Sequence, residues 1–306
     1  MRYLFFINPA AGRDKTKQKL RTAIDKYFSE NGGDYQVITT RFAGDAEQIA
    51  RCEAQKGDSI RMFACGGEGT CYEIVNGVKD FSNVEVGVIP CGSANDFLKY
   101  FDSRDPFYDI AAQIGGESVK MDLIKANDRY CINGCSVGMD AMVARDMRLF
   151  KRLPLVGGSL AYKLAIVKVF LGKLGVCIDL SVDGKKLGKI SCLFAVLANA
   201  PFYGGGYKGA PAAVPFDGHL DLTLVDVISR LKILKFLPLY EKGEHTDLDC
   251  CHISVCEGIE FSSEKPLPVN LDGEIVETCK MRFEIVKEAL SFVIPKGIKT
   301  KILTKV

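Results

Sequence analysis

The first hundred residues repeat one pattern four times, and this repetition constrains the fold more than any other feature of the chain. Each repeat consists of an apolar run of β-forming residues, a loop rich in Gly, Asn or Asp, and a stretch whose apolar residues have helical spacing. The four apolar runs are 3–7, 35–39, 60–64 and 84–89. Strands that alternate with helices so regularly predict βαβ units, and therefore an α/β domain with a parallel sheet covered on both faces.

The loops that follow these runs indicate a phosphate site. Ligands of parallel sheets bind at the carboxyl ends of the strands, where all four loops fall. In loop 66–70, which reads Gly-Gly-Glu-Gly-Thr, the glycines allow close backbone approach to an anion, and the following helix supplies amide donors. One such loop alone would suit a tight turn without a ligand. Four at one sheet edge favour binding, although the chain has neither a GxxxxGK[ST] motif nor the HRD and DFG motifs of protein kinases.

The pattern changes after about residue 119. Most later apolar runs alternate or are joined by short Asp/Asn/Gly turns, as in hairpins 121–137 and 176–197. Two segments with helical character interrupt them, near 139–173 and 230–242. We therefore place a domain boundary near residue 120 and expect a second, mainly antiparallel β domain.

Composition excludes several classes of protein. The 306 residues carry 40 Lys and Arg against 38 Asp and Glu, so no global field attracts nucleic acid. The 12 cysteines form no CxxC pair and have no His partners at zinc-ligand spacing, which favours reduced thiols in a cytoplasmic protein. The longest uncharged run, 190–207, contains Asn199, Pro201 and three consecutive glycines, so we expect a buried strand followed by a glycine loop.

Motifs in a fixed order along the chain resemble one known family. The later ones are Met121-Asp122-Leu123, Tyr203-Gly204-Gly205-Gly206, Asp217-Gly218-x-Leu220-Asp221 and Leu271-Asp272-Gly273-Glu274. The earlier ones are Asn8-Pro9-x-x-Gly12, Thr40-x-x-x-Gly44-Asp45-Ala46, Gly66-Gly67-Glu68-Gly69-Thr70-x-x-Glu73 and Pro90-x-Gly92-Ser93-x-Asn95-Asp96. Together they resemble the diacylglycerol kinase catalytic-domain family, which includes bacterial lipid kinases and the sphingosine and ceramide kinases.

The resemblance implies a fold and a domain division. We expect an N-terminal α/β nucleotide-binding domain at 1–120, similar to those of NAD kinase and phosphofructokinase. An all-β sandwich that receives the lipid would follow at 121–295. The end of the chain, 296–306, would return to the first domain.

The resemblance also implies site residues. Asp122 would face the lipid hydroxyl, and Asp217 would bind a structural Mg²⁺ with the backbone carbonyls of Val214 and His219. Such an oxygen-only site suits Mg²⁺. The residues expected to contact ATP are Asn8, Pro9, Thr40, Gly66, Gly67, Gly69, Thr70, Glu73, Gly92, Ser93 and Asn95.

Transfer of a γ-phosphoryl group needs alignment, neutralisation of charge by Mg²⁺, and a base for the attacking hydroxyl. By resemblance the base is Glu274, which follows the Asp272-Gly273 turn, and Asp272 is a second carboxylate of the catalytic set. The rival base is Glu68, where much of the family has Asp. The extra methylene moves that carboxylate by about one bond length, while catalytic geometry tolerates only about half an ångström.

The predicted function is an ATP-dependent lipid kinase that acts on a diacylglycerol-like or sphingoid alcohol. Two alternatives stay open: an NAD kinase, and a non-catalytic nucleotide-binding protein motivated by Glu68. The sequence does not name the lipid, because lipid tails are distinguished by pocket shape.

A lipid substrate requires contact with a membrane surface. In segment 159–173, Leu160, Leu164, Val167 and Leu171 lie on one side, near Lys163, Lys168 and Lys173. This helix either contacts an anionic bilayer or packs on the domain with its lysines solvated. We expect a cytoplasmic protein with peripheral membrane contact, and leave a homodimer open as a partner.

Overall fold

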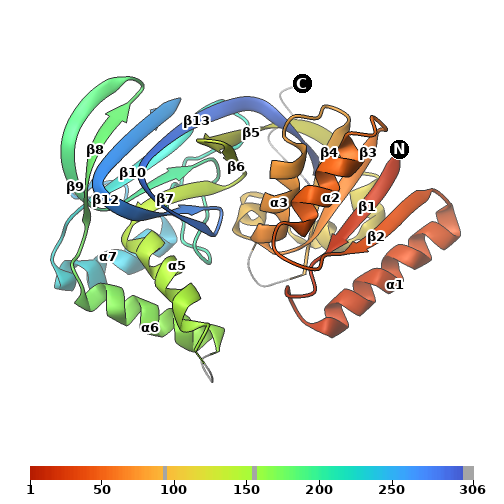
Figure 1. Cartoon of the computed structure of the whole chain (residues 1–306), viewed down its shortest axis with the longest axis horizontal. Coiled ribbons are helices and arrows are strands. Elements are labelled where there is room, and N and C mark those ends of the chain that lie inside the picture. The colour runs from red at the N-terminus through yellow and green to blue at the C-terminus, as the bar shows by residue number, and fades with distance from the viewer. Residues whose placement is uncertain (92–94, 154–156, 299–306) are drawn as a thin grey trace. The chain divides into compact units, whose positions relative to one another are not determined.

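The computed structural model describes residues 1–91, 95–153 and 157–298 (Figure 1). The chain divides into two compact units, one of 1–123 together with 287–306, and one of 124–286. The chain passes between the units within two strands, β5 (Glu117–Ala126) and β13 (Glu274–Ile294). We expected these crossings at 120/121 and 295/296, and in the structure they fall at 123/124 and 286/287. Residues 299–306 of the expected return lie outside the described residues.

The first unit has the expected α/β architecture. Its parallel sheet has the order β2-β1-β3-β4-β13, with the C-terminal part of β13 beside β4. The short helices after β4 begin with a 3₁₀ helix, where the sequence suggested an ordinary one. The elements are β1 (Arg2–Ile7), α1 (Asp14–Asn31), β2 (Asp34–Thr39), α2 (Asp45–Ala54), β3 (Ile60–Gly66), α3 (Glu68–Val78), β4 (Val84–Pro90), η1 (Asp96–Tyr100), η2 (Asp105–Tyr108) and α4 (Ile110–Ile114).

The register of the strands brings their carboxyl ends level. Ile7 of β1 lies opposite Thr39 of β2 and Cys65 of β3, and Gly66 lies opposite Pro90 of β4. Each of the four loops therefore starts at the same edge of the sheet.

An aromatic core fixes helix α1 against the sheet. Leu20, Ile24 and Phe28 recur every four residues and are buried in one cluster with Phe5 and Phe63 of the sheet. The rings of Phe5 and Phe63 stack with their centroids 4.9 Å apart. Complete burial of each such side chain stabilises the fold by about 1.5–3 kcal/mol.

Helix α2 is capped by a carboxylate from another helix. Its N-cap residue is Gly44, whose φ is +89° and which has no side chain to cap the helix. The Asp45 carboxylate accepts bonds from the Arg41 amide (2.8 Å) and guanidinium (3.0 Å). The Arg41 guanidinium lowers the pKa of Asp45. The cap comes from Glu73 of α3, which accepts from the amides of Gly44 (2.8 Å) and Ala46 (3.2 Å).

The second unit is the expected antiparallel β domain. Its strands follow the order β11-β10-β9-β7-β12-β13, while β8 pairs with both β9 and β12. The predicted 176–197 hairpin and both helical regions are confirmed. The elements are β6 (Arg129–Cys131), β7 (Gly134–Gly138), α5 (Met139–Phe150), α6 (Gly158–Leu171), β8 (Val176–Val182), β9 (Lys185–Ala198), β10 (Leu220–Asp226), α7 (Arg230–Lys242), β11 (Cys251–Cys256) and β12 (Gly258–Leu271).

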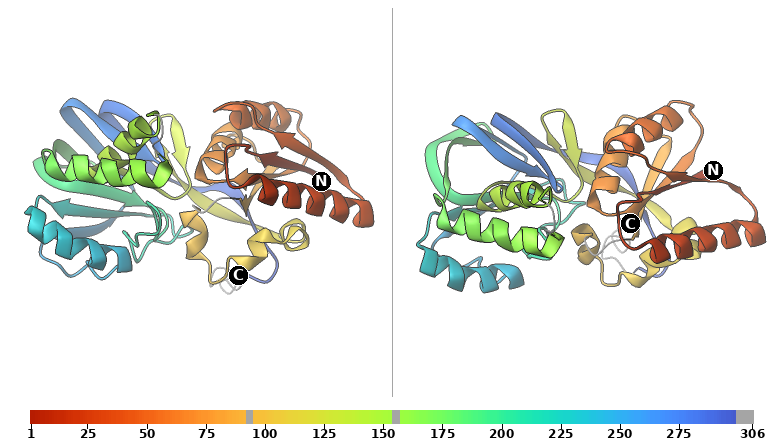
Figure 2. Two further views of the ribbon diagram at one scale, coloured as in Figure 1. Left: turned by 90° about the horizontal axis from the view of Figure 1, so that it is seen from below. Right: turned by 60° about the horizontal axis from the view of Figure 1, so that its bottom comes forward.

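Helices α5, α6 and α7 lie together on one side of this unit (Figures 1 and 2). Phe194 of β9 and Val225 of β10 share a buried cluster with Ile233, Phe236 and Tyr240 of α7. Side chains alternate between the two faces of a strand. Leu222 and Leu224 of β10 therefore lie on the face opposite Val225 and point away from the helices.

The turn between β12 and β13 is anchored by a buried carboxylate. Asp272 has a φ of +49° and is only 7% exposed. Its carboxylate accepts from three consecutive amides in the β6–β7 loop, those of Ile132 (2.5 Å), Asn133 (3.1 Å) and Gly134 (2.8 Å). Burial raises the pKa of Asp272 to about 6, and the three amides oppose this rise.

We predict that Asp272→Ala lowers the free energy of unfolding by about 2–4 kcal/mol, because three buried amides lose their acceptor. The matched control is Asp183→Ala. Asp183 also has a positive φ and accepts from two amides, of Glu257 and Gly258, but it is exposed, so water replaces it. Urea unfolding measures both variants, and equal losses would contradict the anchoring role of Asp272.

Candidate functional site

Backbone bonds hold the four loops of the first unit to neighbouring strand ends. The amide of Asn8 donates to the carbonyl of Cys65 (3.3 Å), and the amide of Thr40 donates to that of Ile7 (3.0 Å). The amide of Cys91 donates to the carbonyl of Gly66 (3.2 Å). The loops therefore form one cluster, as their place after the strands predicted.

Three of the predicted ATP-contacting residues meet within this cluster. The Asn8 side-chain amide donates to the Thr70 hydroxyl (3.3 Å), while its oxygen accepts from the amide of Ala10 (2.9 Å). A Cβ atom on Gly66 would lie 2.4 Å from the Thr70 hydroxyl oxygen. Glycine is therefore required at residue 66 for Asn8 and Thr70 to approach each other.

The first and fourth loops also touch. Gly12 has a φ of +66°, and a Cβ atom there would lie 2.0 Å from the carbonyl oxygen of Cys91. Only glycine fits this contact. Gly92 and Ser93, which the sequence assigned to ATP binding, lie outside the described residues.

Helix α3 presents its N-terminus to this cluster. Gly67 is its N-cap and, being glycine, has no side chain to cap the helix. The first amides of an α-helix lack partners within the helix and carry a partial positive charge, so this end suits a phosphate oxygen. Gly69 and Thr70 follow within the first turn.

Glu68, the first residue of α3, is tied to the fourth loop. One of its carboxylate oxygens accepts from the amide of Asp96 (2.9 Å). The neighbouring Asn95 donates from its side chain to the carbonyl of Gly66 (3.2 Å). Glu68 is half-buried, so its carboxylate stands at the border between the glycine loop and the loop after β4.

Two other predicted ATP contacts lie at the second loop. Thr40 is buried at the end of β2, and Glu73 caps helix α2 with both carboxylate oxygens. This bonding gives Glu73 a structural task. Its contact with ATP stays a prediction.

Lys17 is a residue that sequence reasoning missed. Its ammonium donates to the carbonyl of Pro9 and pairs with Asp14 (2.9 Å), and its side chain is only 11% exposed. Its charge lowers the pKa of the Cys91 thiol, although burial raises that pKa more. A cation thus lies beside the first and fourth loops. The available signal was its position in the first turn of the helix after the Asn8-Pro9 motif.

In the second unit, Glu274 is held by a cation from α5. Arg148 pairs with the Glu274 carboxylate (2.8 Å) and donates to the carbonyl of Gly273 (2.6 Å). The Glu274 side chain is 43% exposed. The carboxylate of Asp272, by contrast, turns inward to the three amides described above.

Asp122, the predicted contact of the lipid hydroxyl, is a buried residue of β5. Its carboxylate accepts from the amide of Glu288 in β13 (2.8 Å). Glu288 has a φ of +55°, so this bond fixes an irregular point in the strand.

The predicted magnesium loop is polar and negatively charged. Asp217 accepts from the amide of His219 (3.0 Å), and the carbonyl of Val214 accepts from Phe216 (2.8 Å). Burial, and then the charge of Asp217, raise the pKa of Asp221 to about 6. Paired carboxylates and carbonyl oxygens fit a hard divalent cation. Among the described residues no cluster of three or more His, Cys, Asp and Glu could hold a metal; the predicted site relies on carbonyls instead.

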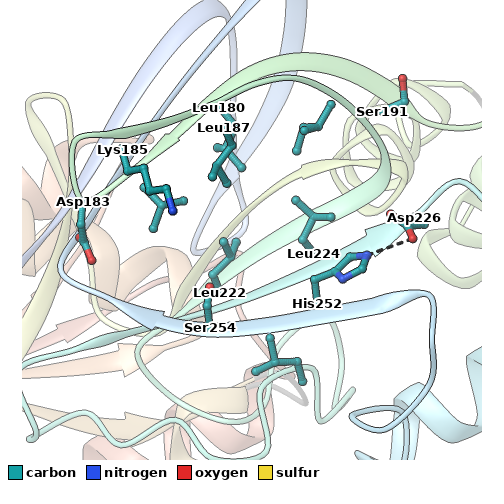
Figure 3. Close-up of a pocket in the computed structure, with 13 residues that line it drawn as sticks. Leu180, Asp183, Lys185, Leu187, Ser191, Leu222, Leu224, Asp226, His252 and Ser254 are labelled. Carbon is teal, nitrogen blue, oxygen red and sulfur yellow. Dashed lines mark hydrogen bonds and ion pairs between the residues drawn. The ribbon is translucent and has the colours of Figure 1, made fainter.

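A hollow of about 590 Å³ opens elsewhere in the second unit, among β8, β9, β10 and β11 (Figure 3). Its wall is mostly apolar, with Leu180, Leu187 and Leu224 in view and the His252–Asp226 pair (3.0 Å) at one side. None of the predicted site residues lines it.

Within the described parts of the chain, no helix combines the length and apolar character needed to cross a bilayer. The 190–207 run indeed forms the end of strand β9 followed by turns.

Two family models match the chain. The diacylglycerol kinase catalytic domain matches residues 2–126. The YegS C-terminal NAD kinase beta sandwich-like domain matches residues 133–294. The two matches follow each other along the chain, in the order of the α/β unit and the β unit.

Relatives match over nearly the full length. The probable lipid kinase YegS-like protein of Shewanella frigidimarina is 32% identical over 267 residues, which cover 85% of each chain. The diacylglycerol kinase of Staphylococcus carnosus is 28% identical over 95% of this chain and 94% of its own. The crystal structure of a diacylglycerol kinase from Bacillus anthracis shares the fold, with a TM-score of 0.69 and 18% identity over 97% of this chain and 98% of its own. The chain therefore belongs to the diacylglycerol kinase catalytic-domain family and carries that family's YegS-type C-terminal domain.

Proposed function

We propose that the protein transfers the γ-phosphoryl group of ATP to the hydroxyl group of a lipid, either a diacylglycerol-like or a sphingoid alcohol. Membership of the lipid kinase family supports the reaction class. The observation that carries the proposal is the cluster of glycine loops around the N-terminus of α3, whose N-cap is a glycine.

The residues of this cluster can hold the phosphates of ATP. The α3 amides and the Thr70 hydroxyl donate to phosphate oxygens, and Gly66 keeps the backbone free of a Cβ atom at that point. Lys17 supplies a positive charge beside the same loops. Such fixed donors stabilise the charge of the transferring group without reorganisation.

Mg²⁺ is the implied metal, and Asp217 with the carbonyls of Val214 and His219 would hold it in a structural role. Burial and the charge of Asp217 together raise the pKa of Asp221, and a bound Mg²⁺ would neutralise the Asp217 charge. Nothing in this arrangement requires the metal at 214–219 to touch the phosphates.

Two carboxylates are candidates for the base that accepts the proton of the lipid hydroxyl. Glu274 is half-exposed and oriented by Arg148, and Glu68 is oriented by the amide of Asp96 beside the glycine loop. We propose Glu274 as the base, with Glu68 as the rival. The Asp272 carboxylate accepts hydrogen bonds from three backbone amides. We therefore propose that Asp272 positions the turn before Glu274 and does not itself exchange protons.

We expect Glu274→Gln to lower kcat about a hundredfold or more, the scale of a lost general base, with little change in the KM for ATP. Glutamine keeps an acceptor for Arg148, so the turn stays intact. Glu277→Gln is the matched control, because Glu277 lies on the same strand, is 48% exposed and also faces an arginine of α5, Arg145. Transfer of labelled phosphate to lipid extracts measures each variant.

The same assay separates the other outcomes. A comparable loss in Glu68→Gln, with Glu274→Gln nearly normal, would move the base to Glu68. Formation of NADP from NAD and ATP would overturn the lipid assignment. Tight ATP binding with no transfer to any lipid would make the protein a nucleotide-binding member, and the variant Glu68→Asp would then stay inactive.

We expect Mg²⁺ to raise the Tm of the protein, and Asp217→Asn to abolish this rise. The pH dependence has a definite sign. Because the folded pKa of Asp221 lies above its unfolded value, Asp221 stabilises the fold below about pH 4, and this contribution is lost as the pH rises through about 6. Removing the Asp217 charge, or binding Mg²⁺ there, lowers that pKa and weakens the dependence.

Thermal unfolding at several pH values, with and without Mg²⁺, measures both effects. The control is Asp226→Asn, at the other end of β10, where the carboxylate pairs with His252. A Mg²⁺-dependent rise that is equal in wild type and Asp217→Asn would remove the metal from this loop.

A further inference from the structure

Helix α6 buries its small residues and exposes its large ones. Ala161, Ala165 and Val169, spaced four apart, face the interior of the unit. Leu160, Leu164, Val167 and Leu171 are exposed. A helix on the surface of a soluble domain ordinarily buries its large apolar side chains. The outer side of α6 thus has the composition of a contact surface.

Helix α7 extends this surface. Leu231 is 75% exposed and Leu234 is 57% exposed, whereas Ile233 and Phe236 pack inward. Leu231 and Leu171, which is 70% exposed, are the two most exposed large apolar residues in the described part of the chain.

Arg230 joins the two helices at these leucines. Its guanidinium donates to the carbonyls of Phe170 (2.8 Å) and Gly172 (2.7 Å) at the end of α6. The end of α6 and the start of α7 are therefore held side by side, each with a leucine directly next to the bonded residues. We call the exposed residues Leu160, Leu164, Val167, Leu171, Leu231 and Leu234 the leucine face.

The two chain segments that carry the leucine face have an excess of positive charge. Segment 148–173 contains six Lys and Arg and no Asp or Glu, and segment 229–240 contains three and none. The whole chain is nearly balanced, with 40 cations and 38 anions, so this excess is local. Exposed leucines on segments rich in cationic side chains complement an anionic lipid surface, because apolar groups enter the headgroup boundary and cations attract the phosphates. The anions beside α6 are Asp146, which is buried and pairs with Lys168, and Glu241, which follows the second segment and acts on Tyr162.

We propose that the leucine face docks on the surface of an anionic bilayer. Leu171, Leu231 and Leu234 enter the boundary between headgroups and acyl chains, while Lys173, Lys232 and Lys235 contact lipid phosphates. This inference rests on exposure and charge alone. It is measured without nucleotide, so it stands or falls separately from the kinase assignment.

One lysine of α6 is unsuitable as a probe. Lys168 pairs with the carboxylate of Asp146 (2.9 Å), whose side chain is only 2% exposed, and its ammonium lies 5.8 Å from the Phe150 ring centroid. Reversing its charge would place two negative charges together at a buried position, so lost binding could reflect damage to the fold. The leucines carry no such structural role.

The test is sedimentation of the whole protein with vesicles of phosphatidylglycerol or of phosphatidylcholine. We expect binding to phosphatidylglycerol that weakens with salt, and a loss of about tenfold or more in Leu171→Gln/Leu231→Gln. The control is Leu187→Gln/Val255→Gln, which changes residues that are 50% and 60% exposed on β9 and β11 of the same unit. The control should bind as the wild type does.

Charge reversal in Lys232→Glu/Lys235→Glu should lower binding and flatten its salt dependence. Absence of wild-type binding to phosphatidylglycerol, or equal binding by the leucine and control variants, would overturn the proposal. A dimer in light scattering that disappears only in the leucine variant would also overturn it, by assigning the face to a second copy of the chain.

Discussion

The candidate site depends on one constraint, the parallel register of the first unit's strands. Because Ile7, Thr39, Gly66 and Pro90 end their strands at one level, four loops that begin up to 83 residues apart emerge together. The contacts between them then tolerate only small residues, as the 2.0 Å approach at Gly12 and the 2.4 Å approach at Gly66 show. Loop packing by itself therefore requires glycine at residues 12 and 66.

Carboxylates in several of the motifs accept hydrogen bonds from backbone amides and so fix the backbone locally. Glu73 caps α2, and Asp122 accepts a hydrogen bond from the amide of Glu288 in β13. Asp272 accepts hydrogen bonds from three amides of the β6–β7 loop. A charged acceptor satisfies amides that would otherwise be buried without a partner, and their loss is costly. Glu73 and Asp122 fix the backbone of the first unit in this way, and Asp272 fixes the turn before Glu274 in the second.

The packing of α6 explains why its leucines are exposed. Its sheet faces the helices through Phe194 and Val225, and α6 completes the packing with alanines, which leaves its leucines outward. That arrangement stabilises the unit less than a normal amphipathic helix would. A lipid surface is the environment in which the exposed leucines become favourable.

The sequence alone determined the α/β and β units and most strands and helices, because hydrophobic periodicity and turn residues act over short distances. It also placed the four loops at one edge of the sheet, because each follows a parallel strand. It did not predict that Glu73 caps α2, that Lys17 reaches Pro9, or that Asp45 turns back to Arg41. The sequence also did not show which side of helix 159–173 faces water, the side of Leu160 or the side of Ala161. Only tertiary structure decided these points, since a side chain's partner depends on which distant segment packs against it.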